Sequence, residues 1–173
     1  MLMNNLSVYF LAVMPSMILA NVLHMFIVKY KILQQFNKPL SITYFGSNKT
    51  WRGFIIVPLL NAFFLLLLNY IFTMHIKNAV GLGLLLGFTY VLFELPNSFL
   101  KRRAGIQPGE TASGKNYFFM ILDKTDSAFG IALVCYFIGG LTITEALLLL
   151  LINSLTHILI SLLLVSLKIK SSF

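Results

Sequence analysis

The chain has 173 residues, of which 58% are hydrophobic and only 10% charged, and its formal net charge is +8. A soluble domain carries about 25% charged residues, so this chain has too little polar surface to cover a water-facing globule. The composition therefore favours an integral membrane protein. The basic residues stand between apolar runs, which favours contacts with lipid or phosphate and argues against a nucleic-acid partner.

Five apolar runs follow one another and predict about five transmembrane helices in a single domain over residues 1–173. A helix needs about 20 residues to cross the hydrocarbon core, and the third and fourth runs are short by this standard. The expected fold is an all-α integral membrane protein. Its spans should cover roughly 6–28, 54–74, 79–95, 127–141 and 143–167.

The basic residues predict which side of the membrane each connection faces. The first five residues carry no Lys or Arg, whereas Lys29 and Lys31 follow the first run, which is the wrong polarity for a cleaved signal peptide. In a five-span arrangement, Lys77 is the one basic residue on its side, and the other Lys and Arg lie on the opposite side. Positive loops stay cytoplasmic, so we expect the N-terminus outside and the C-terminus inside.

Two long connections, roughly 29–53 and 96–124, would then face the cytoplasm from the cell membrane. Functional residues tend to lie on loops that a rigid scaffold displays. Because both connections face the same compartment, we expect them to form one site together.

The first polar segment, residues 46–53, lies before the second run and combines glycines with two cations. Backbone amides at a helix start attract anions, and Lys and Arg bind phosphate oxygens as a point charge and a planar fork. The residue order is not that of a Walker A loop. Anchoring of Trp51 at the lipid headgroups, together with cytoplasmic positive charge, is the alternative explanation. The candidates for phosphate binding are Lys49, Thr50 and Arg52.

The second polar segment, residues 94–109, holds three adjacent cations after the third run. Pro96 predicts the end of the helix, and Pro108-Gly109 predicts a turn. Glu94 lies within or beside the hydrocarbon, where a carboxylate is costly and usually faces a polar cavity or a cation. A polybasic patch against anionic lipid is the alternative. The candidates for phosphate binding are Asn97, Lys101, Arg102 and Arg103.

The third segment carries Asp123 and Asp126, whose spacing places both carboxylates on one face of a helix. Two such groups repel each other unless a cation lies between them, and hard oxygen ligands near phosphate suit Mg²⁺. The alternative is a capping carboxylate at the start of the fourth helix. Glu94, Asp123 and Asp126 are three of only five acidic residues in the chain. Their position opposite many cations is what a magnesium–nucleotide site requires.

We expect the other polar residues of the apolar runs to contribute to helix packing and not to catalysis. His24, His75 and His157 share no metal-ligand spacing, and we expect His24 and His157 to form hydrogen bonds between helices. Gly83 and Gly87 have the GxxxG spacing that permits close approach of two membrane helices.

The three polar segments, in this order, resemble the CDP-archaeol synthase family, which is related to the phosphatidate cytidylyltransferases. Two positions depart from the family patterns. Glu110 occupies a position where the phosphatidate cytidylyltransferases resemble one another in having His, and Lys124 occupies a position where the archaeol branch more often has Gln. The resemblance covers essentially the whole chain. It rests on Asn48-Lys49-Thr50-Trp51-Arg52-Gly53, on Pro96-Asn97-Ser98-Phe99, Lys101-Arg102-Arg103 and Gly105-Ile106-Gln107-Pro108-Gly109, and on Asp123-Lys124-Thr125-Asp126.

The resemblance implies transfer of CMP from CTP to a membrane lipid phosphate, with release of pyrophosphate. The acceptor would be an archaeol-type unsaturated diether glyceryl phosphate or phosphatidic acid. Mg²⁺ would be held by Asp123 and Asp126 with help from Glu94, and Asp123, Asp126 and Lys101 would be the catalytic residues. The residues that bind the nucleotide and the phosphates would be Lys49, Thr50, Arg52, Asn97, Arg102 and Arg103.

Two other classes of function remain open at this point. A transporter would have polar side chains along the midplane of several helices, whereas the polar residues within these runs are scattered. A non-catalytic protein that binds anionic lipid would not need three carboxylates on the same face as the cations. Magnesium-dependent binding of CTP would favour the enzyme over both.

Overall fold

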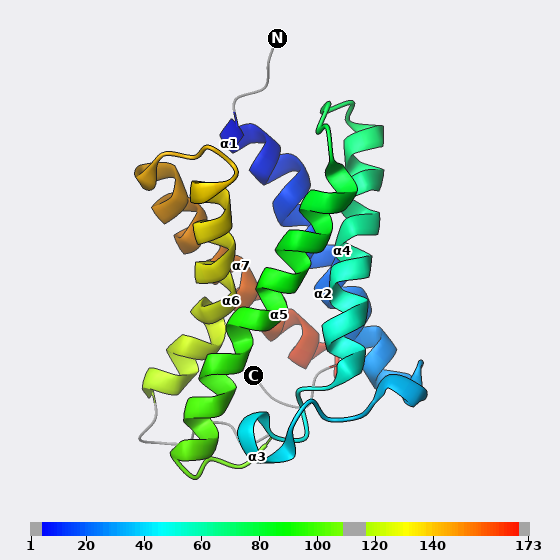
Figure 1. Cartoon of the computed structure of the whole chain (residues 1–173), viewed down its shortest axis with the longest axis vertical. Coiled ribbons are helices and arrows are strands. Elements are labelled where there is room, and N and C mark those ends of the chain that lie inside the picture. The colour runs from blue at the N-terminus through cyan, green and yellow to red at the C-terminus, as the bar shows by residue number, and fades with distance from the viewer. Residues whose placement is uncertain (1–4, 109–116, 170–173) are drawn as a thin grey trace.

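A computed structural model describes residues 5–108 and 117–169 as a bundle of long helices (Figure 1). Helix α1 (Asn5–Val8) and a π-helical turn (Tyr9–Val13) lead directly into α2 (Met14–Lys29). A 3₁₀ turn (Gln34–Phe36) and the short α3 (Ile42–Phe45) follow, and the remaining helices are α4 (Trp51–Ile71), α5 (Ala79–Arg103), α6 (Tyr117–Phe137) and α7 (Ile143–Ser166). The prediction of an all-α membrane protein is confirmed.

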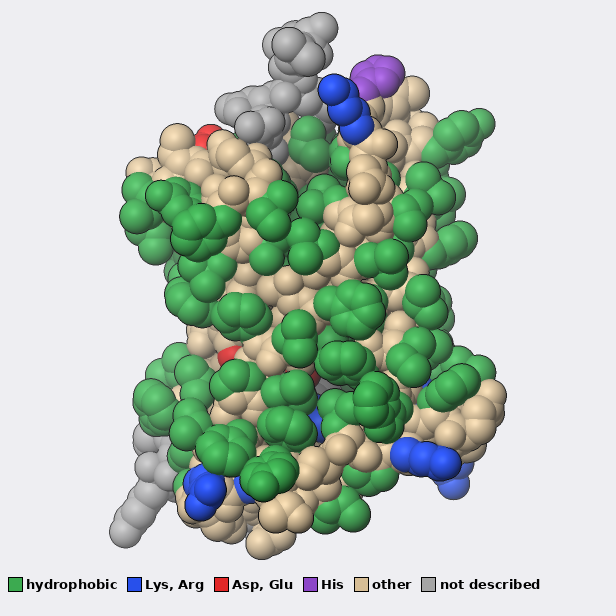
Figure 2. Space-filling model, viewed as in Figure 1, with side chains coloured by type: hydrophobic (Ala, Val, Ile, Leu, Met, Phe, Trp, Pro, Cys, Tyr) green, Lys and Arg blue, Asp and Glu red, His purple; other side chains and the backbone are tan. Residues whose placement is uncertain are grey.

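Among the described residues, four helical stretches are long and apolar enough to cross a membrane: Leu6–Lys29, Trp51–Ile71, Ala79–Arg103 and Ile143–Ser166. Helix α6 is not among them, although its C-terminal part coincides with the fourth predicted span. Figure 2 shows hydrophobic side chains over the middle of the molecule and most Lys and Arg side chains near one end. The chain is thus a multi-pass membrane protein, and the fifth span and the orientation remain predictions.

The two ends of the bundle differ in the connections they carry (Figure 1). The α4–α5 and α6–α7 connections lie at one end. The segment 30–50, which includes α3, lies with the C-terminal part of α5 at the other, which we call the cavity end. Helix α5 packs between α4 and α6, α2 packs mainly on α4, and α7 packs mainly on α6. Direct contact between α2 and α7 is slight.

Helices α4 and α5 approach closely because α5 carries glycines where it crosses α4. A Cβ atom at Gly83 would lie 2.5 Å from the Cα of Ala62, and one at Gly87 would lie 2.4 Å from the Cα of Pro58. No side chain fits at such distances, so the predicted role of the GxxxG spacing is confirmed.

A buried hydrogen-bonded chain fixes the same crossing. The Asn61 amide donates to the Gly83 carbonyl at 2.8 Å, and the Ser16 hydroxyl donates to the Asn61 side-chain oxygen at 2.9 Å. The Ser16 hydroxyl also lies 2.7 Å from the Val13 carbonyl oxygen, the alternative acceptor for its single hydrogen. Helices α2, α4 and α5 are therefore joined by polar groups that are satisfied away from water.

Two sequence-based boundaries were wrong, and both errors affect the site. Pro96 does not end the third helix, because α5 continues to Arg103 with Pro96 inside it. One proline removes one backbone donor, but the surrounding turns persist, and the basic residues at the C-terminus of α5 suit the helix dipole. Asp123 lies well inside α6, which begins at Tyr117, so neither aspartate caps this helix.

Part of the second predicted loop is therefore helical and forms the C-terminal end of α5 and the N-terminal end of α6. The other features predicted there lie outside the described residues: the end of the Pro108-Gly109 turn, Glu110 and Lys115. The first four residues and Lys170 also lie outside them.

Candidate active site

A cavity of about 1090 Å³ opens at the cavity end and reaches between α2, α4, α5, α6 and α7. This volume is at the upper end of the roughly 300–1,000 Å³ typical of ligand pockets. All of the residues predicted for the site line it except Arg103. They are Lys49, Thr50, Arg52, Glu94, Asn97, Lys101, Arg102, Asp123 and Asp126.

One face of α5 supplies much of the polar lining. Tyr90, Glu94, Asn97 and Lys101 line the cavity and follow one another at helical spacing, so an uninterrupted helix presents them on the same side. The continuation of α5 through Pro96 is what places Asn97 and Lys101 beside α6. The site is therefore formed more by helix ends than by the two loops we expected.

The carboxylates of α6 converge on a single amide group of α5. The Asn97 Nδ2 donates to Asp123 Oδ1 at 2.6 Å and to Asp126 Oδ2 at 3.1 Å. The Lys101 ammonium forms an ion pair with Asp123, and the backbone N–H of Ser127 donates to Asp126 Oδ1 at 2.6 Å. Two carboxylates thus lie close together, and hydrogen bonds and one cation offset their repulsion.

Lys49 is held opposite this pair by the segment before α4. The Leu40 N–H donates to the Lys49 carbonyl at 2.8 Å, and the Trp51 N–H donates to the Lys38 carbonyl at 2.9 Å, so two strand-like stretches pair just before the helix. Thr50 then caps α4 by accepting from the Gly53 N–H at 3.4 Å.

The Lys49 ammonium forms an ion pair with Glu94 of α5. Burial acts to lower the pKa of Lys49, but the Glu94 carboxylate outweighs it, so the pKa is raised above its ordinary value. Lys49 is therefore a cation at neutral pH.

Two guanidinium groups in the cavity keep N–H groups without an acceptor among the described residues. Arg52 is 4% exposed and donates from Nη1 to the Ile32 carbonyl at 3.2 Å, while its Nε has no partner there. Arg102 has no partner within the described chain for its Nε and Nη1. A buried N–H without an acceptor is costly, so these groups are suited to an anionic ligand.

Gly46 makes room for Arg102. Its φ is +82°, and a Cβ there would lie 3.0 Å from Pro108 Cγ and 3.4 Å from Arg102 Nε. Both the left-handed backbone and the crowding require glycine at this position. Arg103 lies elsewhere: its guanidinium stacks over the Phe99 ring at 5.3 Å from the ring centre, and it is exposed.

The residues that could hold Mg²⁺ are fewer than the sequence suggested. Within residues 5–108 and 117–169, no three His, Cys, Asp or Glu side chains are grouped as a metal site, and Glu94 is paired with Lys49. Asp123 and Asp126 remain, and they lie close enough together for the Asn97 Nδ2 to reach both. Mg²⁺ is commonly bound by one or two carboxylates plus substrate phosphates, so this oxygen donor set fits it.

The cavity also contains polar residues that we did not predict as part of the site: His24, Tyr90, His157 and Ser161. Tyr90 could have been found, since it lies one helical turn before Glu94. His157 contacts the Lys124 carbonyl at 3.4 Å, so its expected interhelical role is confirmed. The Nε2 of His24 is buried and has no partner in the described chain, so the same expectation was wrong for this atom.

Lys124, between the two aspartates, faces away from α5. Its ammonium donates to the Ser161 hydroxyl of α7 at 3.1 Å, and the side chain is 6% exposed. Lys124 thus joins α6 to α7 in the wall of the cavity, and the aspartates on either side of it face Asn97.

Comparison with known proteins identifies the family. A family model described as CarS-like, CDP-archaeol synthase, matches residues 40–173. Searches of curated proteins and of solved structures found no significant match. The matched range contains all three polar segments and the carboxylates, amide and lysine that meet in the cavity. The chain therefore belongs to the CDP-archaeol synthase family, whose members are transferases of phospholipid biosynthesis.

Proposed function

We propose that the chain transfers CMP from CTP to a membrane lipid phosphate and releases pyrophosphate. The observation that carries the proposal is the meeting of Asp123 and Asp126 at one amide of α5, inside a cavity lined by several cations. Nucleotidyl transfer to a phosphate needs carboxylates for a metal and cations for phosphates in one site. Of the cations that line the cavity, we assign this role to Lys49, Arg52, Lys101 and Arg102.

The arginines are the best-placed groups for the phosphates of both substrates. Arg52 and Arg102 present N–H groups without acceptors in the described chain, and a guanidinium binds phosphate with two parallel hydrogen bonds. Lys49 and Lys101 add point charges, the first beside Glu94 and the second beside Asp123. Together these side chains would hold the triphosphate and the lipid phosphate close enough to react.

Asp123 and Asp126 would hold Mg²⁺. The bound metal would neutralise charge on the phosphates and stabilise the departing pyrophosphate. A lipid phosphate oxygen attacks the α-phosphorus of CTP, a new P–O–P bond forms, and the bond to the pyrophosphate oxygen breaks. The lipid phosphate is already ionised near neutral pH, so no side chain need act as a strong general base.

Membership of the CDP-archaeol synthase family supports our proposal of an archaeol-type unsaturated diether glyceryl phosphate as the acceptor, with phosphatidic acid as the alternative. With the cavity end in the cytoplasm, soluble CTP reaches the cavity from water while the chains of the lipid stay in the bilayer.

The first test is turnover by purified protein with radiolabelled CTP, Mg²⁺ and a panel of lipid phosphates. We expect a labelled CDP-lipid, and we expect Asp123→Asn and Asp126→Asn each to lower the rate by at least roughly a hundredfold. Each change keeps the size of the side chain and removes its negative charge. Glu145→Gln is the matched control, because this carboxylate caps α7 at the opposite end of the bundle.

Wild-type rates in both aspartate variants would refute the assignment of the metal site. Absence of CTP binding with retained affinity for anionic vesicles would instead favour a non-catalytic lipid-binding protein. Size-exclusion profiles and melting temperatures of the variants separate loss of chemistry from loss of folding.

A further inference from the structure

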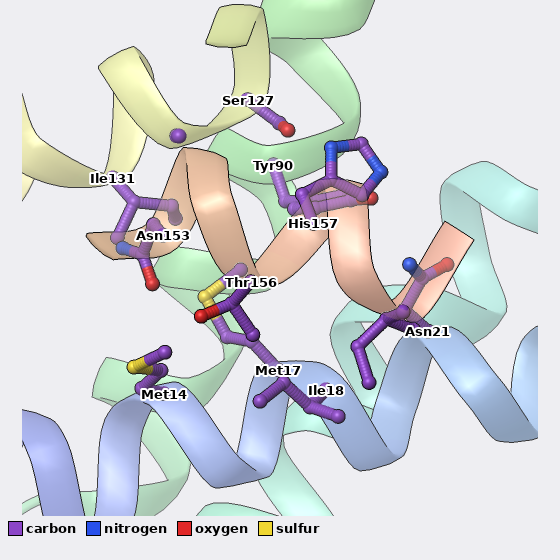
Figure 3. Close-up of a pocket in the computed structure, with 12 residues that line it drawn as sticks. Met14, Met17, Ile18, Asn21, Tyr90, Ser127, Ile131, Asn153, Thr156 and His157 are labelled. Carbon is purple, nitrogen blue, oxygen red and sulfur yellow. The ribbon is translucent and has the colours of Figure 1, made fainter. Parts of the chain in front are cut away.

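A second, smaller pocket of about 50 Å³ lies between α2, α6 and α7 (Figure 3). Two helices face each other across it with stripes of the same spacing. Met14, Met17, Ile18 and Asn21 follow at helical intervals along α2, and Asn153, Thr156, His157 and Ile160 do so along α7. The two stripes are therefore single helix faces turned toward a shared space.

The slight contact between α2 and α7 explains why this space exists. Helix α2 is held by α4 and helix α7 by α6, so no tight packing closes the gap between them. The pocket lies in the membrane-spanning part of both helices. A hydrocarbon chain is the surrounding solvent at that depth.

The pocket adjoins the active-site cavity at one end. Asn21, Tyr90 and His157 line both spaces, and we call these three residues the neck. Figure 3 shows the neck residues toward one end of the pocket and Met14 and Ile131 toward the other. Methionine and isoleucine therefore predominate at the far end, where Asn153 is the polar residue beside Ile131.

We propose that this pocket, which we call the tail pocket, holds a stretch of one hydrocarbon chain of the lipid phosphate acceptor. The inference rests on the proposed function for the position of the phosphate, which would lie in the adjoining cavity. The neck would then meet the glycerol oxygens, where the polar headgroup gives way to the chain. Asn21, Tyr90 and His157 carry groups that form hydrogen bonds with ether or ester oxygens.

The residues that line the tail pocket favour a hydrocarbon chain as its ligand over a charged or strongly polar group. None of the pocket's lining residues is an Asp, Glu, Lys or Arg. The Thr156 hydroxyl is already used, since it donates to the Ile152 carbonyl at 2.8 Å. The apolar lining residues are Met14, Met17, Ile18, Ala128, Ile131 and Ile160.

The size of the tail pocket limits what it can recognise. A space of about 50 Å³ accommodates only a few carbon atoms, so it holds the part of one chain nearest the glycerol. The flexible Met14 and Met17 can adjust to a branched or an unbranched chain. The rest of the chain would lie in the bilayer beyond the gap between α2 and α7.

The test fills the pocket from its two sides with Ile18→Trp and Ile160→Trp. Each has a matched control one residue away that faces lipid: Leu19→Trp, at a position 41% exposed, and Leu159→Trp, at a position 65% exposed. We expect the pocket variants to raise the KM for lipid phosphate about tenfold or more and to leave the KM for CTP unchanged. The controls should stay within about twofold of wild type for both substrates.

A second measurement needs no turnover. A lipid phosphate with a photoreactive diazirine on a chain carbon close to the glycerol is irradiated with the protein in the absence of CTP. We expect labelled peptides from α2 and α7 in wild type and loss of that labelling in Ile18→Trp and Ile160→Trp. If the tryptophan variants fold poorly, Met14→Ala provides a separate test because it enlarges the pocket. We expect this variant to be labelled more strongly than wild type by a probe whose chain carries a bulkier branch.

The outcomes separate this inference from the proposed function. Normal turnover in wild type, with pocket variants indistinguishable from their controls, would overturn the tail pocket and leave the transfer reaction standing. Labelling of the tail pocket without any CDP-lipid from wild type would support the tail pocket and overturn the reaction. Labelling confined to lipid-facing positions such as Leu159 would overturn the tail pocket whatever the turnover.

Discussion

Lys49 and Glu94 join the segment before α4 to the middle of α5, and each side chain keeps about a quarter of its exposure to solvent, 26% and 23%. The energy of such a pair lies between that of an exposed ion pair, about 0–1 kcal/mol, and the roughly 3–5 kcal/mol lost when one partner of a buried pair is removed. The pair therefore contributes both to the shape of the cavity and to stability.

We predict that Lys49→Met lowers the free energy of unfolding by about 2 kcal/mol, because it leaves the Glu94 carboxylate partly buried without its cation. Adding Glu94→Gln should recover part of the loss. Chemical or thermal unfolding in detergent measures both, and Lys77→Met at the opposite end is the control. Equal stability of wild type and Lys49→Met would show that the pair contributes nothing.

The same difference should depend on pH in alkaline solution. The pKa of Lys49 in the folded protein lies above its ordinary value of 10.5, so from neutral pH up to that value the lysine keeps its charge and the stabilisation is present. It is lost only as the pH rises through the raised value. The stability gap between wild type and Lys49→Met should accordingly be constant across neutral pH and narrow in strong alkali.

At the scale of single residues, the sequence indicated which side chains meet but not how they pair. Glu94, Asp123 and Asp126 were expected to share a metal, whereas Glu94 is paired with Lys49 and Asn97 bridges the aspartates. Such pairings depend on the rotation of α5 and α6 about their axes, which no pattern within one segment determines.

At the scale of helices, the crossing of α4 and α5 sets the width of the cavity. Gly83 and Gly87 let the two backbones touch, and the same two helices carry Arg52 and Glu94 toward the cavity. A change in the crossing would therefore move cations relative to carboxylates.

We predict that Gly83→Ala and Gly87→Ala each destabilise the protein by about 1–3 kcal/mol, since the added methyl group cannot fit against the α4 backbone. Both should also lower the rate of transfer, because α5 shifts away from α4. Gly53→Ala is the stability control: its Cβ would lie 3.5 Å from the His24 ring, an ordinary contact. Unchanged melting temperatures in the two α5 variants would contradict the close crossing.

The helices themselves could be predicted from apolar runs, but two of their ends could not. Pro96 is a strong local signal against helix, yet tertiary contacts of α5 with α4 and α6 keep the helix intact beyond it. The start of α6 was placed too late because Asp123 and Asp126 interrupt the apolar run, although they occupy a polar face of an amphipathic helix end.

At the scale of the whole molecule, the basic residues are distributed very unequally between the two ends of the bundle. Lys77 lies in the α4–α5 connection, whereas Lys38 and Lys49 lie in the segment at the cavity end. This asymmetry is what the positive-inside rule relates to the cytoplasm, and the arrangement of helices in Figure 1 is consistent with it.

We predict that the cavity end faces the cytoplasm. In a Cys135→Ala background, which removes the buried free thiol, cysteines are introduced as Lys77→Cys and Lys38→Cys at exposed positions. A membrane-impermeant maleimide should label position 77 on intact cells and position 38 only after the membrane is opened. The reverse pattern would place the cavity outside.

The two ion pairs of the cavity also bear on the order in which ligands enter. Lys101 already compensates Asp123, and Lys49 already compensates Glu94. A divalent ion that binds alone would take a carboxylate from its pair and leave an ammonium group without a counterion. A triphosphate that binds alone would take an ammonium group from its pair and leave a carboxylate without a counterion. When both arrive, every displaced group finds a new partner. Nucleotide and divalent ion should therefore bind with positive cooperativity, each lowering the dissociation constant of the other by the same factor.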